Sequence, residues 1–318
     1  FFVGQTGDPL QVAAVSQTNP IFILFMAFAN MFGMGGSAAA SMALGEKKEK
    51  RVKQVSSFIT YASLIVGIVF AVILLVGMQP VLQLFGADAD TYELAKGYTT
   101  YISYGAPFII WSAAASFVVR SDGASREAMT GSMIGTVANI ILDPIFIYIM
   151  GVQGAALATV LSQLAASVWT FKFLTGKNTI IKIKLSAMRC QAKRVKKILV
   201  LGLSGFTMSV TNSAVQIACN LSLQNYGSDV YAGVMTIINS IREVLQMPVT
   251  GLGNGAQPII GFNYGAGENG RVKEAIRYLA AMLIIYSTVA WFIILLIPKF
   301  LIGIFTADAA LITAGVPS

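Results

Sequence analysis

The chain has 318 residues, of which 56% are hydrophobic and 11% are charged. Soluble domains carry about 25% charged residues, so this composition excludes a soluble globular protein and predicts an all-α polytopic membrane protein. The sequence contains no histidine, which excludes histidine-based zinc sites, Ser-His-Asp triads and histidine proton relays.

Apolar runs bounded by charges and turn residues predict about eight complete membrane spans, each close to or above the length needed to cross a bilayer. In chain order they cover residues 11–44, 54–86, 93–119, 127–150, 153–174, 198–225, 230–263 and 272–305. The end of an earlier span precedes them and a later span begins after them. We therefore expect the chain to be an interior piece of a longer protein.

The loops between these spans predict the orientation. Nearly all of the 22 lysines and arginines lie in alternate loops, at 45–53, 120–127, 172–197 and 267–277. The intervening loops are rich in aspartate. By the positive-inside rule the basic loops are cytoplasmic, and the formal net charge of +8 reflects topology, with no nucleic-acid partner implied.

The chain also repeats itself. Residues 45–88 align with 265–308 without a gap, and the match includes the charged loops, so we regard chance similarity of apolar stretches as the weaker explanation. A repeat containing an even number of spans predicts two six-helix bundles related by a pseudo-two-fold axis along the membrane normal, and twelve spans in the complete protein. The expected parts are an N-terminal lobe with a truncated first helix, a cytoplasmic basic linker and a C-terminal lobe lacking its last three helices, at 1–174, 175–197 and 198–318.

Two acidic residues fall deep inside apolar spans, and Asp143 is the first. A charge at mid-bilayer costs roughly 2.5–3.5 kcal/mol, so such a residue faces protein or water, or is protonated. Asn139 lies one turn earlier on the same helix face, and Pro144 leaves one backbone carbonyl without its helical donor. Thr159 on the next span offers a hydroxyl. We interpret this group as a site that binds and releases a proton or Na⁺; the alternative is a buried acceptor that pins two helices.

The second buried acid is Glu243. It belongs to a polar stripe with helical spacing on an otherwise apolar helix, formed by Asn239, Glu243, Gln246 and Met247. The preceding span carries a second stripe with four-residue spacing that includes Asn212 and Gln216. We expect a wet cavity that attracts a cationic cargo or a coupling ion. The alternative is a structural role for Glu243, for example in a neutral pair with Arg242, although adjacent helical residues do not face each other well.

Prolines inside the spans, with Pro144 and Pro248 as the main candidates, predict helices that bend. The simpler explanation is that Gly and Pro are common in membrane helices and that small residues allow close packing. The stretch "GLGNGA" at 251–256 lacks the spacing of a nucleotide-binding loop, so we expect no nucleotide partner.

Four stretches together resemble the multidrug and toxic compound extrusion (MATE) family: "FVGQTGDPLQVAAVS", "ANIILDPIFIY", "GVQGAALATVLSQ" and "REVLQMPVTGLGNGAQPIIGFNYGAG". The resemblance covers essentially the whole chain and is strongest to the MepA-like bacterial branch. It implies a multi-pass exporter of two six-helix lobes in the bacterial inner membrane, and we expect this exporter to be a monomer. Such an exporter works by alternating access, antiporting lipophilic cationic drugs against H⁺ or Na⁺, with no further cofactor.

The resemblance also implies roles for individual residues. Asn139 and Asp143 match the family's cation site, with Thr159 as the best match for its threonine, and Na⁺ would bind at Asp143 and Asn139. The family's first-helix acid would precede Phe1. Glu243 matches an acid that handles substrate or ion. The alternatives are a flippase of the same superfamily for lipid-linked saccharides, a membrane-embedded enzyme or a channel.

Overall fold

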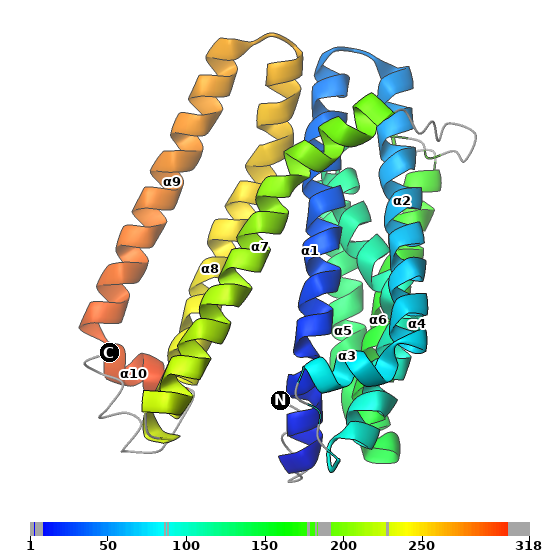
Figure 1. Ribbon diagram of the computed structural model, residues 1–318. Coiled ribbons are helices and arrows are strands. Elements are labelled where there is room, and N and C mark those ends of the chain that lie inside the picture. The colour runs from blue at the N-terminus through cyan, green and yellow to red at the C-terminus, as the bar shows by residue number, and fades with distance from the viewer. Residues whose placement is uncertain are drawn as a thin grey trace. The chain divides into compact units, whose positions relative to one another are not determined.

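The computed structural model describes residues 3, 9–85, 87, 89–176, 179–181, 183, 192–226 and 229–304. The regular structure within these residues is helical (Figure 1). The helices are α1 (Pro9–Gly45), α2 (Glu49–Val76), α3 (Met78–Leu84), α4 (Tyr92–Ser121), α5 (Ser125–Met150), α6 (Val152–Thr175), α7 (Ala192–Tyr226), α8 (Asp229–Gly265), α9 (Asn269–Leu296) and α10 (Pro298–Gly303).

The long helices coincide with the spans that the sequence predicts. Within the described residues, 6 helices are long and apolar enough to cross a membrane, namely α1, α2, α4, α5, α6 and α9. Helices α7 and α8 have 35 and 37 residues and fall on the spans predicted at 198–225 and 230–263, but they are not among those 6. The all-helical membrane architecture is thus confirmed.

Two predicted spans are each divided into a long and a short helix. The run at 54–86 becomes α2 and α3, which meet at Gly77, and the run at 272–305 becomes α9 and α10. Pro298 opens α10, and the residue before it, Ile297, has φ −131° and ψ 46° outside the helical region. A proline disfavours the helical conformation of its predecessor, which explains the second break. Both short helices turn away from the axes of the long ones (Figure 1).

The internal repeat reappears in the helix boundaries. The bounds Pro9–Gly45 and Glu49–Val76 recur as Asp229–Gly265 and Asn269–Leu296, at one constant offset. The short helix α3 in the first copy of the repeat corresponds to α10 in the second copy, and the two begin at the same offset. Two segments that share loop sequences therefore also share the same order of long, long and short helices.

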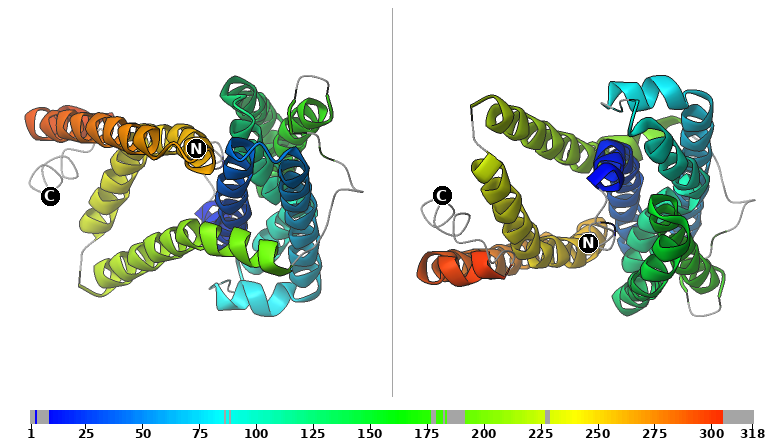
Figure 2. Two further views of the ribbon diagram at one scale, coloured as in Figure 1. Left: turned by 90° about the horizontal axis from the view of Figure 1, so that it is seen from above. Right: turned by 90° about the horizontal axis from the view of Figure 1, so that it is seen from below.

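The chain divides into two compact units, Phe1–Ser209 and Val210–Ser318. In unit 1, α1, α2, α4, α5 and α6 form one bundle, which is seen end-on in Figure 2. Two apolar clusters fill it: one contains Phe25, Ile102 and Ile109, and the other contains Ile59, Trp111 and Val118. The second cluster also takes in Ile181 and Ile183, which lie between α6 and α7 in sequence, and Ile198 on α7.

The first half of α7 packs with unit 1, although the loop composition places the start of the second lobe at residue 198. The cause is a close backbone approach between α7 and α1. A Cβ atom at Gly202 would collide with the carbonyl oxygen of Met31, and one at Gly35 would collide with that of Ile198. Glycines on both helices allow this distance, so the division between the units falls inside α7.

Unit 2 contains α8, α9 and α10, with α8 packed along α9. The hydroxyl of Tyr286 on α9 donates to the carbonyl oxygen of Leu245 on α8 at 3.0 Å. Much of the apolar surface of α9 remains exposed; Ile284, Ile285 and Trp291 are each more than half exposed.

Candidate functional site

Asn139 and Asp143 lie on the side of α5 that faces the rest of unit 1. Gly135 and Ile147, one turn before and one turn after them on the same face, are both buried. The other sides of α5 carry isoleucines that are at least half exposed, namely Ile140, Ile141 and Ile145. Asp143 itself is half-buried. The carboxyl group therefore faces protein, as an acid within a membrane span is expected to do.

A hydrogen bond joins these two residues. The side-chain nitrogen Nδ2 of Asn139 donates to Oδ1 of Asp143 at 3.1 Å, across one helical turn. No lysine or arginine forms an ion pair with Asp143 in the part of the chain that the structure describes. The second carboxylate oxygen and the amide oxygen of Asn139 are thus available for a cation.

Thr159 lies on α6, which packs extensively against α5. Asp143 and Thr159 are equally far in sequence from Gly151, the residue at which the chain turns between the two antiparallel helices. Antiparallel packing therefore places them at a similar level along the hairpin. The hydroxyl of Thr159 donates to the carbonyl oxygen of Ala155 at 2.9 Å, which leaves its lone pairs free to accept or to ligate.

Tyr98 is a neighbour that the sequence did not reveal. It lies on α4, close enough for its phenol to interact electrostatically with the Asp143 carboxylate. Helix α4 packs against both α5 and α6, so the site is enclosed by three helices. No local spacing connects Tyr98 to Asp143, because the two residues meet through helix packing.

This set of groups suits a small monovalent ion. It offers one carboxylate, one amide oxygen and one hydroxyl, and Pro144 cannot donate to the backbone carbonyl of Ile140. Oxygen ligands of this kind bind hard cations, and a single carboxylate balances one positive charge or takes up one proton. Within the described residues there is no cluster of three or more Cys, Asp or Glu side chains that would hold a multivalent metal ion.

The polar stripe predicted on α8 is divided between two sides of that helix. Gln246 and Arg242 line a groove of about 630 Å³ between α8, α9 and α10. Glu243, Asn239 and Met247 do not line it, and Met247 is 68% exposed. Arg242 and Glu243 form no ion pair with each other or with any other described residue. The structure therefore gives no support to a neutral pair of these two neighbours.

The remaining predicted residues are only partly covered. Asn212 is exposed on α7, and the side chain of Gln216 lies outside the described residues. The described residues do not test a wet cavity shared by α7 and α8, which therefore remains a prediction. Pro144 and Pro248 lie inside α5 and α8, and both helices run through them without a break.

A comparison with known families decides what kind of molecule carries this site. The MatE family profile matches residues 1–145 and, in a second segment, residues 205–316. The chain belongs to the MatE family. The two matched segments each contain one copy of the internal repeat.

Relatives of this MatE chain are export proteins. Multidrug export protein MepA of Staphylococcus saprophyticus is 32% identical over 316 residues, which cover 98% of this chain and 69% of that protein. The outward-facing structure of a multidrug resistance MATE family transporter of the MOP superfamily matches with a TM-score of 0.92 and 25% identity, over 98% of this chain and 70% of that one.

A MOP superfamily transporter from Pyrococcus furiosus, whose binding pocket is described as having a reverse polarity that suggests a different function, matches with a TM-score of 0.91 and 25% identity, over 99% of this chain and 71% of that one. These likenesses confirm the family resemblance and the MATE fold. The protein is a multi-pass membrane protein of a transporter family, and the enzyme alternative is thereby excluded.

Proposed function

We propose that the protein is a secondary active multidrug exporter that exchanges organic cations for H⁺ or Na⁺ by alternating access. The observation that carries this proposal is the Asn139–Asp143 pair, which faces protein inside a membrane span and lacks a permanent basic partner among the described residues. A carboxyl group in that position needs a mobile cation to neutralise it. The names of the relatives supply the class of cargo.

In the proposed cycle, ion and cargo compete for, or are coupled through, the charge of Asp143. A proton or Na⁺ that reaches Asp143 from outside neutralises the carboxylate, and Asn139 and Thr159 supply further oxygen atoms. Neutralisation changes the hydrogen bonding near Pro144, where α5 already lacks one backbone bond. This change favours release of the cationic cargo. Coupling of this kind requires that each ligand stabilises a different state of the protein.

The proposed topology follows the charges of the loops. The basic loops at 45–53, 120–127, 172–197 and 267–277 lie in the cytoplasm, and the protein resides in the bacterial inner membrane. A complete exporter would contain two six-helix lobes related by a pseudo-two-fold axis along the membrane normal. The constant offset between α1–α2 and α8–α9 supports that arrangement.

The test is ethidium efflux in inverted membrane vesicles that contain the complete protein. A pH gradient and a Na⁺ gradient are applied separately, so that the coupling ion is identified. We expect one of them to drive transport, and we expect Asp143→Asn to abolish the gradient-dependent part. Full gradient-driven efflux by the Asp143→Asn variant would refute the proposal.

A flippase for lipid-linked saccharides is the second candidate, because Arg242 lines a groove in unit 2 and a transporter of similar fold is described as having reverse pocket polarity. A flippase would use basic groups to hold phosphates. We therefore expect Arg242→Gln to leave ethidium efflux unchanged. Loss of all cargo movement in that variant, with cationic dyes inactive as substrates of the unmodified protein, would favour the flippase.

A further inference from the structure

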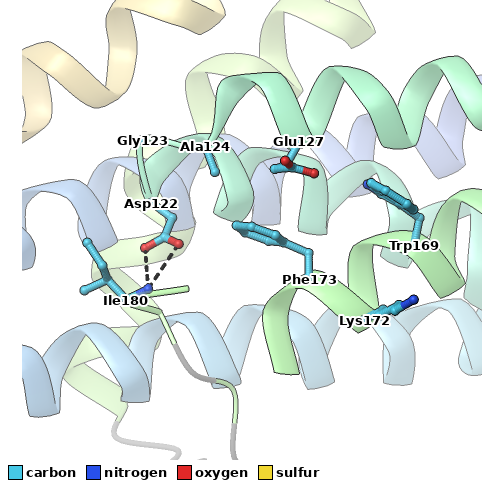
Figure 3. Close-up of a pocket in the computed structure, with 8 residues that line it drawn as sticks. All are labelled: Asp122, Gly123, Ala124, Glu127, Trp169, Lys172, Phe173 and Ile180. Carbon is cyan, nitrogen blue, oxygen red and sulfur yellow. Dashed lines mark hydrogen bonds between the residues drawn. The ribbon is translucent and has the colours of Figure 1, made fainter. Parts of the chain in front are cut away.

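A second cavity lies at the end of unit 1 where α4 ends and α5 begins. It has a volume of about 510 Å³ and is lined by Asp122, Gly123, Ala124, Glu127, Trp169, Lys172, Phe173 and Ile180 (Figure 3). Glu127 is separated from Asp143 by 16 residues of α5, or about 24 Å along the helix axis. The cavity is therefore distinct from the site of Asp143. Its place at the helix ends corresponds to the level of lipid headgroups.

One wall of this cavity is held in place by Asp122. The carboxylate accepts hydrogen bonds from Oγ1 of Thr179 at 2.8 Å, from the amide of Ile180 at 3.1 Å and from the amide of Ile181 at 3.2 Å. Ile181 is fully buried beneath this contact. The acceptor capacity of Asp122 is thus largely used by the protein itself, so Asp122 shapes the cavity and leaves ligand binding to its other residues.

The cavity also contains two opposite charges that do not neutralise each other. Glu127 is half-buried on α5, and Lys172 is exposed in the last turn of α6. Neither side chain forms an ion pair or a hydrogen bond with any residue that the structure describes. The ammonium group of Lys172 is directed away from Glu127 (Figure 3). A ligand with a positive and a negative end would satisfy both.

Aromatic side chains separate the two charges. Trp169 and Phe173 lie one turn apart on α6, and both contribute to the cavity lining. The indole Nε1 of Trp169 is buried and has no hydrogen-bond partner among the described residues. The nitrogen-bearing edge of the ring is turned toward the side of Glu127 (Figure 3). Tryptophan with an unused donor near a helix end is typical of the zone where apolar chains meet polar headgroups.

We propose that this cavity binds the headgroup of an ethanolamine-type phospholipid. The primary ammonium of the headgroup donates to the carboxylate of Glu127. The phosphate accepts a hydrogen bond from the ammonium of Lys172, and the ring of Trp169 packs against the headgroup. Val168 lies one turn before Lys172 and is 60% exposed, which offers apolar surface to an acyl chain. With the orientation proposed above, the lipid comes from the cytoplasmic leaflet.

The choice of an ethanolamine headgroup follows from hydrogen bonding. A primary ammonium supplies donors to a carboxylate, whereas a choline headgroup has none. Phosphatidylglycerol has no cationic group to place beside Glu127. The cavity should therefore prefer phosphatidylethanolamine to phosphatidylcholine and to phosphatidylglycerol.

The experiment is lipid binding to the purified complete protein by native mass spectrometry, with the three phospholipids in competition. The variants are Glu127→Gln, Lys172→Gln and Trp169→Phe, and the matched control is Arg126→Gln. Arg126 is exposed on α5 beside Glu127 and does not line the cavity. Melting temperatures verify that each variant is folded.

We expect phosphatidylethanolamine to bind about tenfold more tightly than phosphatidylcholine, as one charge-assisted hydrogen bond allows. Glu127→Gln should abolish this preference while phospholipid still binds. Lys172→Gln and Trp169→Phe should weaken both lipids alike, and Arg126→Gln should change neither. The proposal would be overturned if Glu127→Gln kept the preference for phosphatidylethanolamine, or if Arg126→Gln changed lipid binding as much as Glu127→Gln. A preference of the unmodified protein for the anionic lipid would also overturn it. So would displacement of the lipid by ethidium, which would assign the cavity to organic cations. None of these outcomes depends on transport.

Discussion

Unit 1 and unit 2 contain the same succession of helices but bury it to different extents. In unit 1, α1 and α2 pack against α4, while in unit 2 the corresponding α8 and α9 pack mainly on each other. The most apolar window of α2 is 28% buried, and that of its counterpart α9 is 6% buried. Within the described residues, α2 packs on two long helices, α1 and α4, whereas α9 packs mainly on α8.

The same contrast separates the two intramembrane acids. Asp143 in unit 1 is held by Asn139 and is surrounded by α4, α5 and α6. Glu243 in unit 2 is exposed and has no ion-pair partner among the described residues. We infer that Asp143 has a fixed environment suited to one small ion, whereas Glu243 acts through its charge on cargo of variable shape.

Substitution of glycines that lie within the helices gives the strongest test of the difference in packing between the two units. In Gly202→Ala, the new Cβ collides with the carbonyl oxygen of Met31, and backbone cannot move aside as a side chain does. We expect a loss of about 2–3 kcal/mol in the free energy of unfolding. The measurement is thermal melting of the purified complete protein.

The comparison variant is Gly251→Ala on α8 in unit 2, where no atom of the residues that the structure describes lies within 4 Å of the added Cβ. We expect no loss there, and a gain of up to about 1 kcal/mol because alanine favours the helix. Equal melting shifts for Gly202→Ala and Gly251→Ala would show that the tight packing of unit 1 is not as described.

The hydrogen bonds of Asp122 hold residues 179–181, which follow α6, against unit 1. Their removal is expected to have the next largest effect on stability. Asp122→Ala removes the acceptor for the amides of Ile180 and Ile181. We expect local opening to become easier by about 1–3 kcal/mol, which raises amide exchange at these positions roughly tenfold or more. Hydrogen exchange with mass spectrometry measures it. The control Asp90→Ala, in an exposed turn, should leave this exchange unchanged; unchanged exchange in Asp122→Ala would contradict the anchoring role.

Glu243→Gln sharpens the contrast between the two acids. An exposed charge attracts cationic cargo through a screened interaction, so we expect a loss of about threefold to fivefold in affinity for ethidium. Affinity for a neutral substrate should not change. Fluorescence titration measures both, with Arg242→Gln as the neighbouring control. Equal losses for charged and neutral compounds would indicate a folding defect and would remove the proposed role of Glu243.

The smallest expected effect is a pH dependence of unit 1. Burial raises the pKa of Asp122 above its ordinary value of 3.8, and the hydrogen bonds from Thr179, Ile180 and Ile181 partly oppose that rise. Folding therefore favours the protonated form, so this contribution to stability is present at acid pH and is lost as pH rises through the raised pKa. Melting temperatures should fall slightly across that window, and Asp122→Asn should remove the trend. An identical pH dependence in Asp122→Asn would contradict it.

The sequence predicted the architecture well because apolar length and loop charge are local properties. The spans, the repeat and the pairing of Asn139 with Asp143 all follow from spacing along one helix. The division of two spans was missed because Gly77 and Pro298 lie within continuous apolar runs, where hydropathy gives no sign of a break.

Features that arise from packing between helices could not be predicted. Tyr98 interacts electrostatically with Asp143 although the two residues lie on different helices. The close approach of Gly202 to α1 likewise brings together two segments that are distant in the sequence. The orientation of Gln246 toward α9, away from Glu243, likewise depends on which face of α8 finds a partner. Helical spacing alone placed both residues on one stripe, which was too coarse.

The central claim is that the carboxyl group of Asp143 exchanges its coupling ion for cargo. The most direct measurement is the release of protons, or of radioactive Na⁺, when ethidium binds to the purified complete protein in weakly buffered solution. The account predicts release of about one ion for each bound cation, as a single carboxylate allows, and none from Asp143→Asn. Release of the same amount of ion by Asp143→Asn would contradict the account.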